Sequence, residues 1–254
     1  MHGSACNTFM DPLIVSAAGG LQSRMDSLSL LANNLANAAS SGYKSDREFY
    51  GLYASAEADT DLGTAPNLPV IQRQWTDFSQ GVLQPTGNQL DIALSGKGFL
   101  AVNSPQGILY TRNGSLHINS NGELTTNEGY TVQNASGGTI KVTTGAPVEI
   151  ATDGTVRQNG VVNGQVRLVD FKSTDPLAKT SGTCFENTDV KNAATTAVGT
   201  EVQQGKLEAS NVAVPEAAMR LVGVMRQFEM LQKAVSMGVD MNSKAIQEVA
   251  RVGA

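Results

Sequence analysis

The sequence is poor in the residues that most often build disulfide, metal or catalytic sites. Its two cysteines are Cys6 and Cys184, and its two histidines are His2 and His117. The cysteines lie far apart, which excludes a disulfide framework and argues against a single bridge. The two histidines cannot make a metal site without further ligands, and no ligand set with the spacing of a metal site lies nearby, so we expect no metal and no cofactor.

Basic residues and long apolar runs are also scarce. The chain has 254 residues, 18 Lys and Arg together and a net charge of −5. No basic run is interleaved with aromatic residues, which argues against nucleic acid as a partner. No apolar run approaches the roughly 18 residues of a membrane span, and the first 23 residues contain no Lys or Arg. We therefore expect neither membrane insertion nor a cleaved signal peptide.

The sequence offers no convincing catalytic group. Residues 96–98, Gly-Lys-Gly, lack the further glycines and the Ser or Thr of a phosphate-binding loop. His117 alternates with Leu116 and Ile118, which predicts a solvated strand face. The candidate carboxylates are isolated on expected turns or strand ends: Asp91, Asp153 and Asp170. We expect no catalytic residue and no enzyme.

What is present is a long apolar repeat near the end of the chain, over residues 215–251. Its spacing of three and four residues predicts the seam of a coiled coil. The repeat consists of Ala218, Leu221, Met225, Phe228, Gln232, Val235, Val239, Asn242, Ile246 and Val249. With Ala218 as position a of the heptad, Leu221 is a d position and Leu231 a g position. The g positions are uncharged, so the apolar stripe is too wide for one partner helix. A long core helix of an ordinary domain is the alternative.

A second repeat of the same kind follows Asp11 and Pro12, which resemble a helix N-cap and first helical residue. This repeat consists of Ile14, Ala18, Leu21, Met25, Leu28, Ala32 and Leu35. We expect the helix to end over residues 37–42, with Gly42 as a left-handed cap. Because each helix is marginal alone in water, we expect the two to pair as a coiled coil.

Between the helices the apolar period changes from helical to alternating. Short strands are predicted within residues 68–172, separated by Asn-Gly, Asp-Gly and Gly-Gly turns. The fold class predicted is α+β: terminal helices paired as a coiled coil, and a central antiparallel all-β domain of hairpin-connected strands. Residues 1–9 are an unpatterned extension, 10–45 and 206–254 form the helical module, and 46–67 and 173–205 are extended connectors.

Five segments resemble the bacterial flagellar basal-body rod and hook family. Residues 32–37 (ANNLAN) followed by 41–44 (SGYK) are similar to its N-terminal signature, and 207–212 (LEASNV) to its C-terminal one. Residues 86–99 and 110–115 (YTRNGS) are similar to its middle region. Residues 11–18 and the length most resemble the proximal rod subunit that lies next to the distal rod protein.

This resemblance implies a structural subunit of the periplasmic rod of the flagellar basal body, exported through the flagellar type III export apparatus. Its partners would be proximal and distal rod subunits, in homo- and hetero-assembly into an axial tube that transmits torque. The expected assembly interface lies on the two helices: Ile14, Leu21, Met25, Leu28, Asn33, Asn34, Leu35, Asn37, Leu221, Met225, Phe228, Leu231, Val235, Val239 and Ile246.

Two questions stay open at this point. The signature asparagines Asn33, Asn34 and Asn37 could be solvated or capping residues, or their amides could bond to neighbouring subunits. Two other functional classes also remain. A phage-tail or adhesin-like fibre could combine coil and β-domain, and a carbohydrate-acting enzyme could hold two carboxylates about 5–10 Å apart in a groove.

Overall fold

The computed structural model describes residues 12–53 and 68–252, which fall into two compact units. The helical unit lies within Met1–Leu35, Asp46–Trp75 and Val214–Ala254. The β unit consists of Ala36–Ser45 and Thr76–Ala213. The chain therefore passes between the units near the end of the first helix, on both sides of residues 46–75 and before the last helix.

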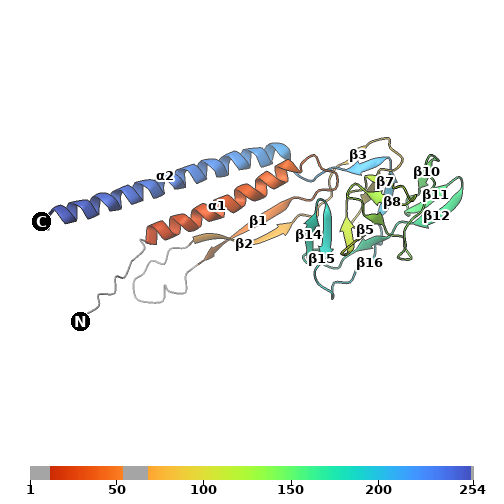
Figure 1. The fold of residues 1–254 in the computed structure, drawn as a ribbon, viewed down its shortest axis with the longest axis horizontal. Coiled ribbons are helices and arrows are strands. Elements are labelled where there is room, and N and C mark those ends of the chain that lie inside the picture. Colours follow the sequence, from red (N-terminus) through yellow and green to blue (C-terminus); the bar gives the residue numbers. More distant parts are fainter. Residues whose placement is uncertain (1–11, 54–67, 253–254) are drawn as a thin grey trace. The chain divides into compact units, whose positions relative to one another are not determined.

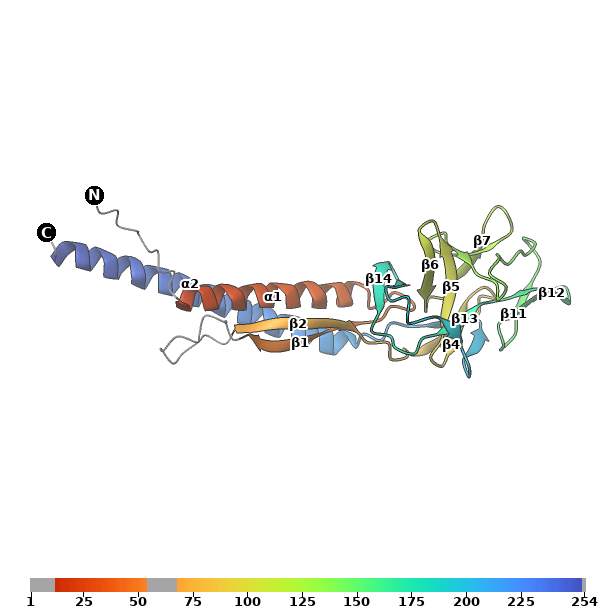
Figure 2. The ribbon, with the colours of Figure 1, turned by 90° about the horizontal axis from the view of Figure 1, so that it is seen from below.

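Two helices dominate the helical unit: α1 (Pro12–Ala36) and α2 (Val214–Val252). They lie side by side and run in opposite directions (Figures 1 and 2). Strands β1 (Asp46–Tyr53) and β2 (Leu68–Thr76) form a separate two-stranded sheet in this part of the chain. The predicted helix over residues 215–251 is confirmed, and the N-terminal helix likewise begins at Pro12.

The helix pair does not bury the predicted coiled-coil seam of α1. Its buried residues are instead mostly small or polar: Gly20, Ser23, Ser27, Leu30, Leu31 and Asn34. A methyl group at Gly20 would lie 3.7 Å from Leu231 Cδ1 of α2, so small side chains let the second helix come close. Met25 of the predicted seam is 50% exposed. Coiled-coil pairing of the two seams is therefore not confirmed.

Apolar side chains lie on two sides of α2. The inner face is buried or half-buried and consists of Leu221, Val224, Phe228, Leu231, Val235 and Gly238. These are d and g positions, whereas the a positions Met225 and Val239 are about half exposed. The outer methionine row is exposed and consists of Met219, Met230, Met237 and Met241. Spacings of 11, 7 and 4 residues place this row on one side of a 3.6-residue helix, well away from the inner face.

The β unit is built from short antiparallel strands. Strand order in its nine-stranded sheet is β14-β15-β6-β5-β9-β8-β7, with β13 pairing both β5 and β16. A three-stranded sheet has the order β10-β11-β12, and two further pairs are β17-β4 and β18-β3. The strands are β3 (Leu83–Pro85), β4 (Ile92–Ser95), β5 (Phe99–Ser104), β6 (Gly107–Thr111), β7 (Leu116–Ile118), β8 (Leu124–Thr126), β9 (Thr131–Val132), β10 (Val148–Ile150), β11 (Thr155–Gln158), β12 (Val161–Gln165), β13 (Leu168–Asp170), β14 (Leu177–Ser181), β15 (Cys184–Asn187), β16 (Thr195–Thr196), β17 (Glu201–Gln204) and β18 (Lys206–Glu208).

Two clusters form most of the core of the β unit. An aliphatic cluster gathers buried Leu, Ile and Val side chains, including Ile92, Leu124 and Val156. An aromatic cluster packs Phe99 and Phe185 among rings that meet edge to face. The antiparallel β fold predicted from alternation and turn dipeptides is thus confirmed.

Some local predictions for the β unit are wrong. Residues 173–205, expected to be an extended connector, contain β14 to β17, and 46–53 form β1. Asn163 and Gly164 lie inside β12, at an irregularity in its pairing with β11, and not in a turn. Gly42 has a φ of +69° but follows the last residue of α1 by six positions, so it does not cap that helix.

Candidate functional site

A buried cluster of three charged side chains lies where segments distant in the sequence meet in the β unit. Glu208 Oε1 accepts hydrogen bonds from Lys44 Nζ at 2.5 Å and from the Gly81 amide at 2.9 Å. Its Oε2 accepts a bond from Arg112 Nη1 at 3.2 Å. The exposed fractions of the Lys44, Glu208 and Arg112 side chains are 0%, 0% and 3%. One carboxylate therefore holds two cations away from water.

Further contacts compensate the buried cations. Lys44 Nζ also donates to the Ser79 carbonyl at 2.7 Å, and Arg112 Nη2 donates to the Gly96 carbonyl at 2.6 Å. Burial lowers the pKa of both Lys44 and Arg112, while the charge and hydrogen bonds of Glu208 act to raise the pKa of each. An ion buried without such partners would cost several kcal/mol.

The ion cluster joins the segments by which the chain enters and leaves the β unit. Lys44 follows α1, Ser79 and Gly81 follow β2, and Glu208 precedes α2. The Gly42 amide also donates to the Glu208 carbonyl at 2.7 Å. The cluster thus fixes three crossing points of the chain against one another.

Asn211, three residues after Glu208, also bonds to the segments that follow α1 and β2. Its Oδ1 accepts a bond from the Ser45 amide, and its Nδ2 donates to the Asp77 carbonyl, both at 2.7 Å. The Asp77 amide donates to the Ser45 carbonyl at 2.8 Å. Side chains of the C-terminal signature therefore hold both of the other crossing segments.

Gly42 shows why a glycine is required at this crossing. A Cβ atom there would lie 2.4 Å from the Asn113 amide nitrogen, and the positive φ is unfavourable for other residues. Gly42, Lys44, Arg112 and Glu208 come from three of the five segments on which the family resemblance rests: 41–44, 110–115 and 207–212. We had not predicted the cluster, although a charged residue inside each of these segments was a usable signal.

The asparagines of the N-terminal signature have separate places in the structure. Asn34 is buried, and its amide makes two bonds with the main chain of Asp46, at 2.8 and 2.9 Å. Asn33 is exposed, and half-buried Asn37 accepts a bond from Ser40 Oγ at 3.4 Å. Asn34 therefore holds the start of β1 within its own chain, which is neither of the roles we had considered.

The predicted apolar interface residues divide between covered and exposed positions. Those that are half-buried on the paired helices are Leu21, Leu28, Leu35, Leu221, Phe228, Leu231 and Val235. Those that remain about half exposed are Met25, Met225 and Val239. The side chains of Ile14 and Ile246 lie outside the described residues. Met225 and Val239, together with the outer methionine row, therefore leave apolar surface on α2 that the described residues do not cover.

The described residues include no helix that is long and apolar enough to cross a membrane. Across the same ranges, 12–53 and 68–252, no group of three metal-binding side chains gathers. His117 is exposed on β7, as predicted. Asp91 is buried and accepts a bond from Asn88 at 3.1 Å.

The architecture defines a class of α+β protein in which two long terminal helices flank a β unit in the sequence, and in which a buried ion cluster joins the entry and exit segments within that β unit. Two family models match this chain. "Flagellar hook protein FlgE/F/G D1 domain" matches residues 93–164, within the β unit. "Flagellar basal body rod FlgEFG protein C-terminal" matches residues 203–248, which span Glu208 and most of α2.

Individual relatives cover nearly the whole chain. A flagellar basal-body rod protein FlgF of Caulobacter vibrioides is 29% identical over 227 residues, covering 89% of this chain and 92% of that protein. A flagellar basal-body rod protein FlgG of Buchnera aphidicola subsp. Acyrthosiphon pisum is 27% identical over 259 residues, covering 94% of this chain and all of that protein. The two family models and these relatives support the flagellar basal-body rod and hook family for this chain. This family is one of structural proteins and is not known as an enzyme family.

Proposed function

We propose that the chain is a structural subunit of the flagellar basal-body rod and that it assembles through the uncovered apolar surface of its terminal helices. The single observation that carries the assembly mode is the outer methionine row of α2. Its four side chains are 60–72% exposed, although α1 covers the inner face of the same helix. A helix that is apolar on two sides has more apolar surface than one partner can bury.

Methionine suits this surface chemically. Its unbranched, polarizable side chain adapts to neighbours of different shape. A rod subunit that contacts copies of itself and also other rod proteins needs such adaptability. Half-exposed Met225 and Val239 extend the uncovered surface along the flank of α2.

The finer assignment is also part of the proposal. The partners are proximal and distal rod subunits, which join this chain in an axial tube that transmits torque across the periplasm, and the subunit reaches this place through the flagellar export apparatus. Rod proteins FlgF and FlgG both occur among the relatives. Within the rod, we place the chain beside the distal rod protein, because of the resemblance of residues 11–18 and the chain length. The relatives' names do not favour the fibre or enzyme alternatives.

The function is tested by deleting the gene and examining isolated basal bodies by electron microscopy. We expect rods that stop short, no hook and no motility, all restored by the wild-type chain. An epitope-tagged chain should appear in purified basal bodies, at the end of the proximal rod. Complete rods in the deletion strain would overturn the assignment.

A further inference from the structure

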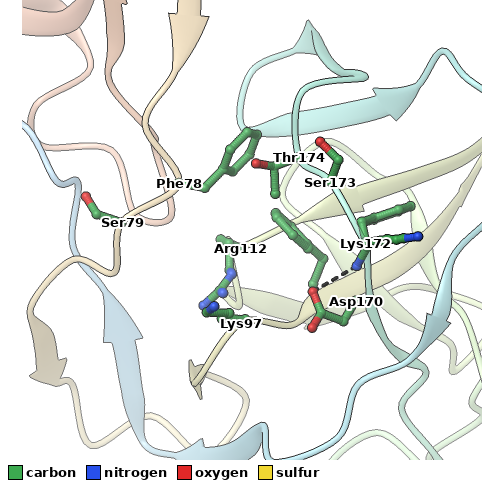
Figure 3. Close-up of a pocket in the computed structure, with 10 residues that line it drawn as sticks. Phe78, Ser79, Lys97, Arg112, Asp170, Lys172, Ser173 and Thr174 are labelled. Atoms are coloured by element: carbon green, nitrogen blue, oxygen red, sulfur yellow. Dashed lines mark hydrogen bonds between the residues drawn. The ribbon is translucent and has the colours of Figure 1, made fainter. Parts of the chain in front are cut away.

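A pocket of about 580 Å³ opens in the β unit, which does not contain the helices of the assembly proposal. Its lining includes Phe78, Lys97, Phe99, Arg112, Asp170 and Lys172 (Figure 3). These residues come from the segments before β3 and between β4 and β5, and from the ends of β6 and β13. The pocket is thus formed by segments far apart in the sequence.

The chemistry of the pocket is cationic above an aromatic floor. The Phe78 and Phe99 rings meet edge to face with centroids 5.6 Å apart. Lys97 and Lys172 are exposed and make no ion pair with any described residue. Asp170 is the acidic residue of the lining, and its Oδ1 accepts a bond from the Phe171 amide at 2.8 Å. Two lysines therefore face one carboxylate.

Arg112 lies over the aromatic floor, with its guanidinium carbon 5.2 Å from the centroid of the Phe99 ring. Its terminal nitrogens are used by Glu208 and Gly96, and its Nε is buried. Lys97 and Lys172 are therefore the cations that a ligand in the pocket can reach. A pocket with free ammonium groups beside phenyl rings suits a carboxylate that lies next to an aliphatic side chain.

The sequence contains one segment with this chemistry. Residues 54–67 carry Glu57, Asp59 and Asp61, and Leu62 follows the last of them. No Lys or Arg occurs between Arg47 and Arg73. No other part of the chain combines three acids with the absence of a base over such a length.

We propose that this pocket receives the acidic segment, residues 54–67, of a second copy of the chain. Its carboxylates pair with Lys97 and Lys172, and Leu62 packs on the phenylalanines. This contact goes beyond the rod function, since it concerns the β unit and a contact between like subunits. It also requires no exchange of helices, so it can form between subunits that are already folded.

Binding is tested with a fluorescein-labelled peptide of residues 54–67, titrated with the full chain and followed by fluorescence anisotropy. The receptor chain carries E57Q, D59N and D61N, so that its own segment does not compete. We expect saturable binding that weakens with added salt. We expect K97E with K172E to weaken it by about ten-fold or more, because each reversal replaces attraction by repulsion.

Two controls separate the pocket from general charge attraction. K141E with K191E makes the same charge change at exposed lysines that do not line the pocket, and should leave binding unchanged. A peptide with the same three acids amidated should not bind. Equal loss in both lysine pairs, equal binding by wild type and K97E/K172E, or no saturation would each overturn the proposal. Because the assay uses unassembled chain, its failure leaves the rod assignment standing.

Discussion

Glu208 is the residue that most directly holds together the segments by which the chain enters and leaves the β unit. It is fully buried and bonded to Lys44, Arg112 and the Gly81 amide. A buried ion cluster contributes little net free energy over an apolar replacement, but removing one member leaves uncompensated charge. Glu208 is the only anion of the three, so its loss leaves two cations together.

We expect Glu208→Gln to destabilise the β unit by about 3–5 kcal/mol, because it leaves two buried cations without a compensating anion. Lys44→Met should cost less, since Glu208 keeps Arg112 and the Gly81 amide. Glu201→Gln removes an exposed carboxylate nearby in sequence and should stay within about 0.5 kcal/mol of wild type. Urea unfolding followed by strand circular dichroism measures all three. A Glu208 variant as stable as the Glu201 variant would mean that the cluster does not hold the crossing.

Cys184 provides a second prediction at the scale of single residues. It is fully buried, and burial, followed by the charge of Glu128, raises the pKa of its thiol to about 12. In a Cys6→Ser chain, Cys184 should not react with a thiol reagent such as DTNB at neutral pH until the β unit is unfolded in urea.

The same shift sets a pH dependence. The unfolded thiol ionises from about pH 9, whereas the folded thiol keeps its proton to about pH 12. The folded state therefore binds more protons in this window, and its stability falls as pH rises through it. Cys184→Ala should flatten that fall in urea midpoints measured between pH 8 and about 10.5. Rapid reaction of the folded Cys6→Ser chain with DTNB at neutral pH would contradict the burial of the Cys184 thiol on which both predictions rest.

The limits of sequence reasoning also appear at single residues. Lys44, Arg112 and Glu208 are separated by up to 164 positions, so only the fold brings them together. The Asn34 amide bonds to main-chain atoms of Asp46. Since every residue has such atoms, the sequence does not identify this partner. The Asn159-Gly160 turn was predictable, because φ values of +51° and +78° suit these residues, whereas the same dipeptide type at Asn163 became part of β12.

At the scale of elements, the apolar period predicted both helices but not their buried faces. α1 buries small and polar positions such as Gly20 and Ser27, whereas the leucines of its predicted seam are half-buried. On α2 the d positions Leu221 and Phe228 are half-buried, and so is most of the g row, in which Val224 is the most buried. Both rows are apolar, so the sequence alone could not decide which of them an intramolecular partner covers.

Unequal helix lengths lead to a prediction about dynamics. α2 has 39 residues and α1 has 25, and Figure 1 shows the C-terminal part of α2 extending beyond the start of α1. In the unassembled chain, amide hydrogens of residues 239–252 should exchange faster than those of 221–235 by about ten-fold or more, because fewer buried contacts hold them. Hydrogen exchange with mass spectrometry measures this. Incorporation into the rod should slow the distal segment, and uniform protection in the monomer would contradict it.

At the scale of the whole molecule, the β unit folds around buried clusters of its own. The β unit has its own aliphatic and aromatic clusters, so a charge added to the outer surface of α2 should leave its fold unchanged. The division into helical ends and a β middle was predicted from the sequence. The boundaries inside this division were not predicted. The short strands in residues 173–205 alternate only weakly, and they form because they pair with strands such as β6 and β4.

The most direct measurement of the central claim compares neighbouring residues on one turn of α2. Met237 belongs to the outer methionine row, whereas Ser236 is exposed and its hydroxyl bonds to the Lys233 carbonyl. Aspartate at either position makes the same charge change. Only at Met237 would the carboxylate enter the proposed subunit interface, where desolvation costs several kcal/mol. Met225→Asp tests the flank in the same way.

Each variant is returned to the deletion strain, and completed rods are counted by electron microscopy beside a motility assay, with circular dichroism of the purified chain as the check on folding. We predict that Met237→Asp and Met225→Asp fold like wild type but yield few completed rods, while Ser236→Asp supports normal assembly. Normal rods with Met237→Asp and Met225→Asp, or equal failure with Ser236→Asp, would contradict assembly through the uncovered apolar surface of α2.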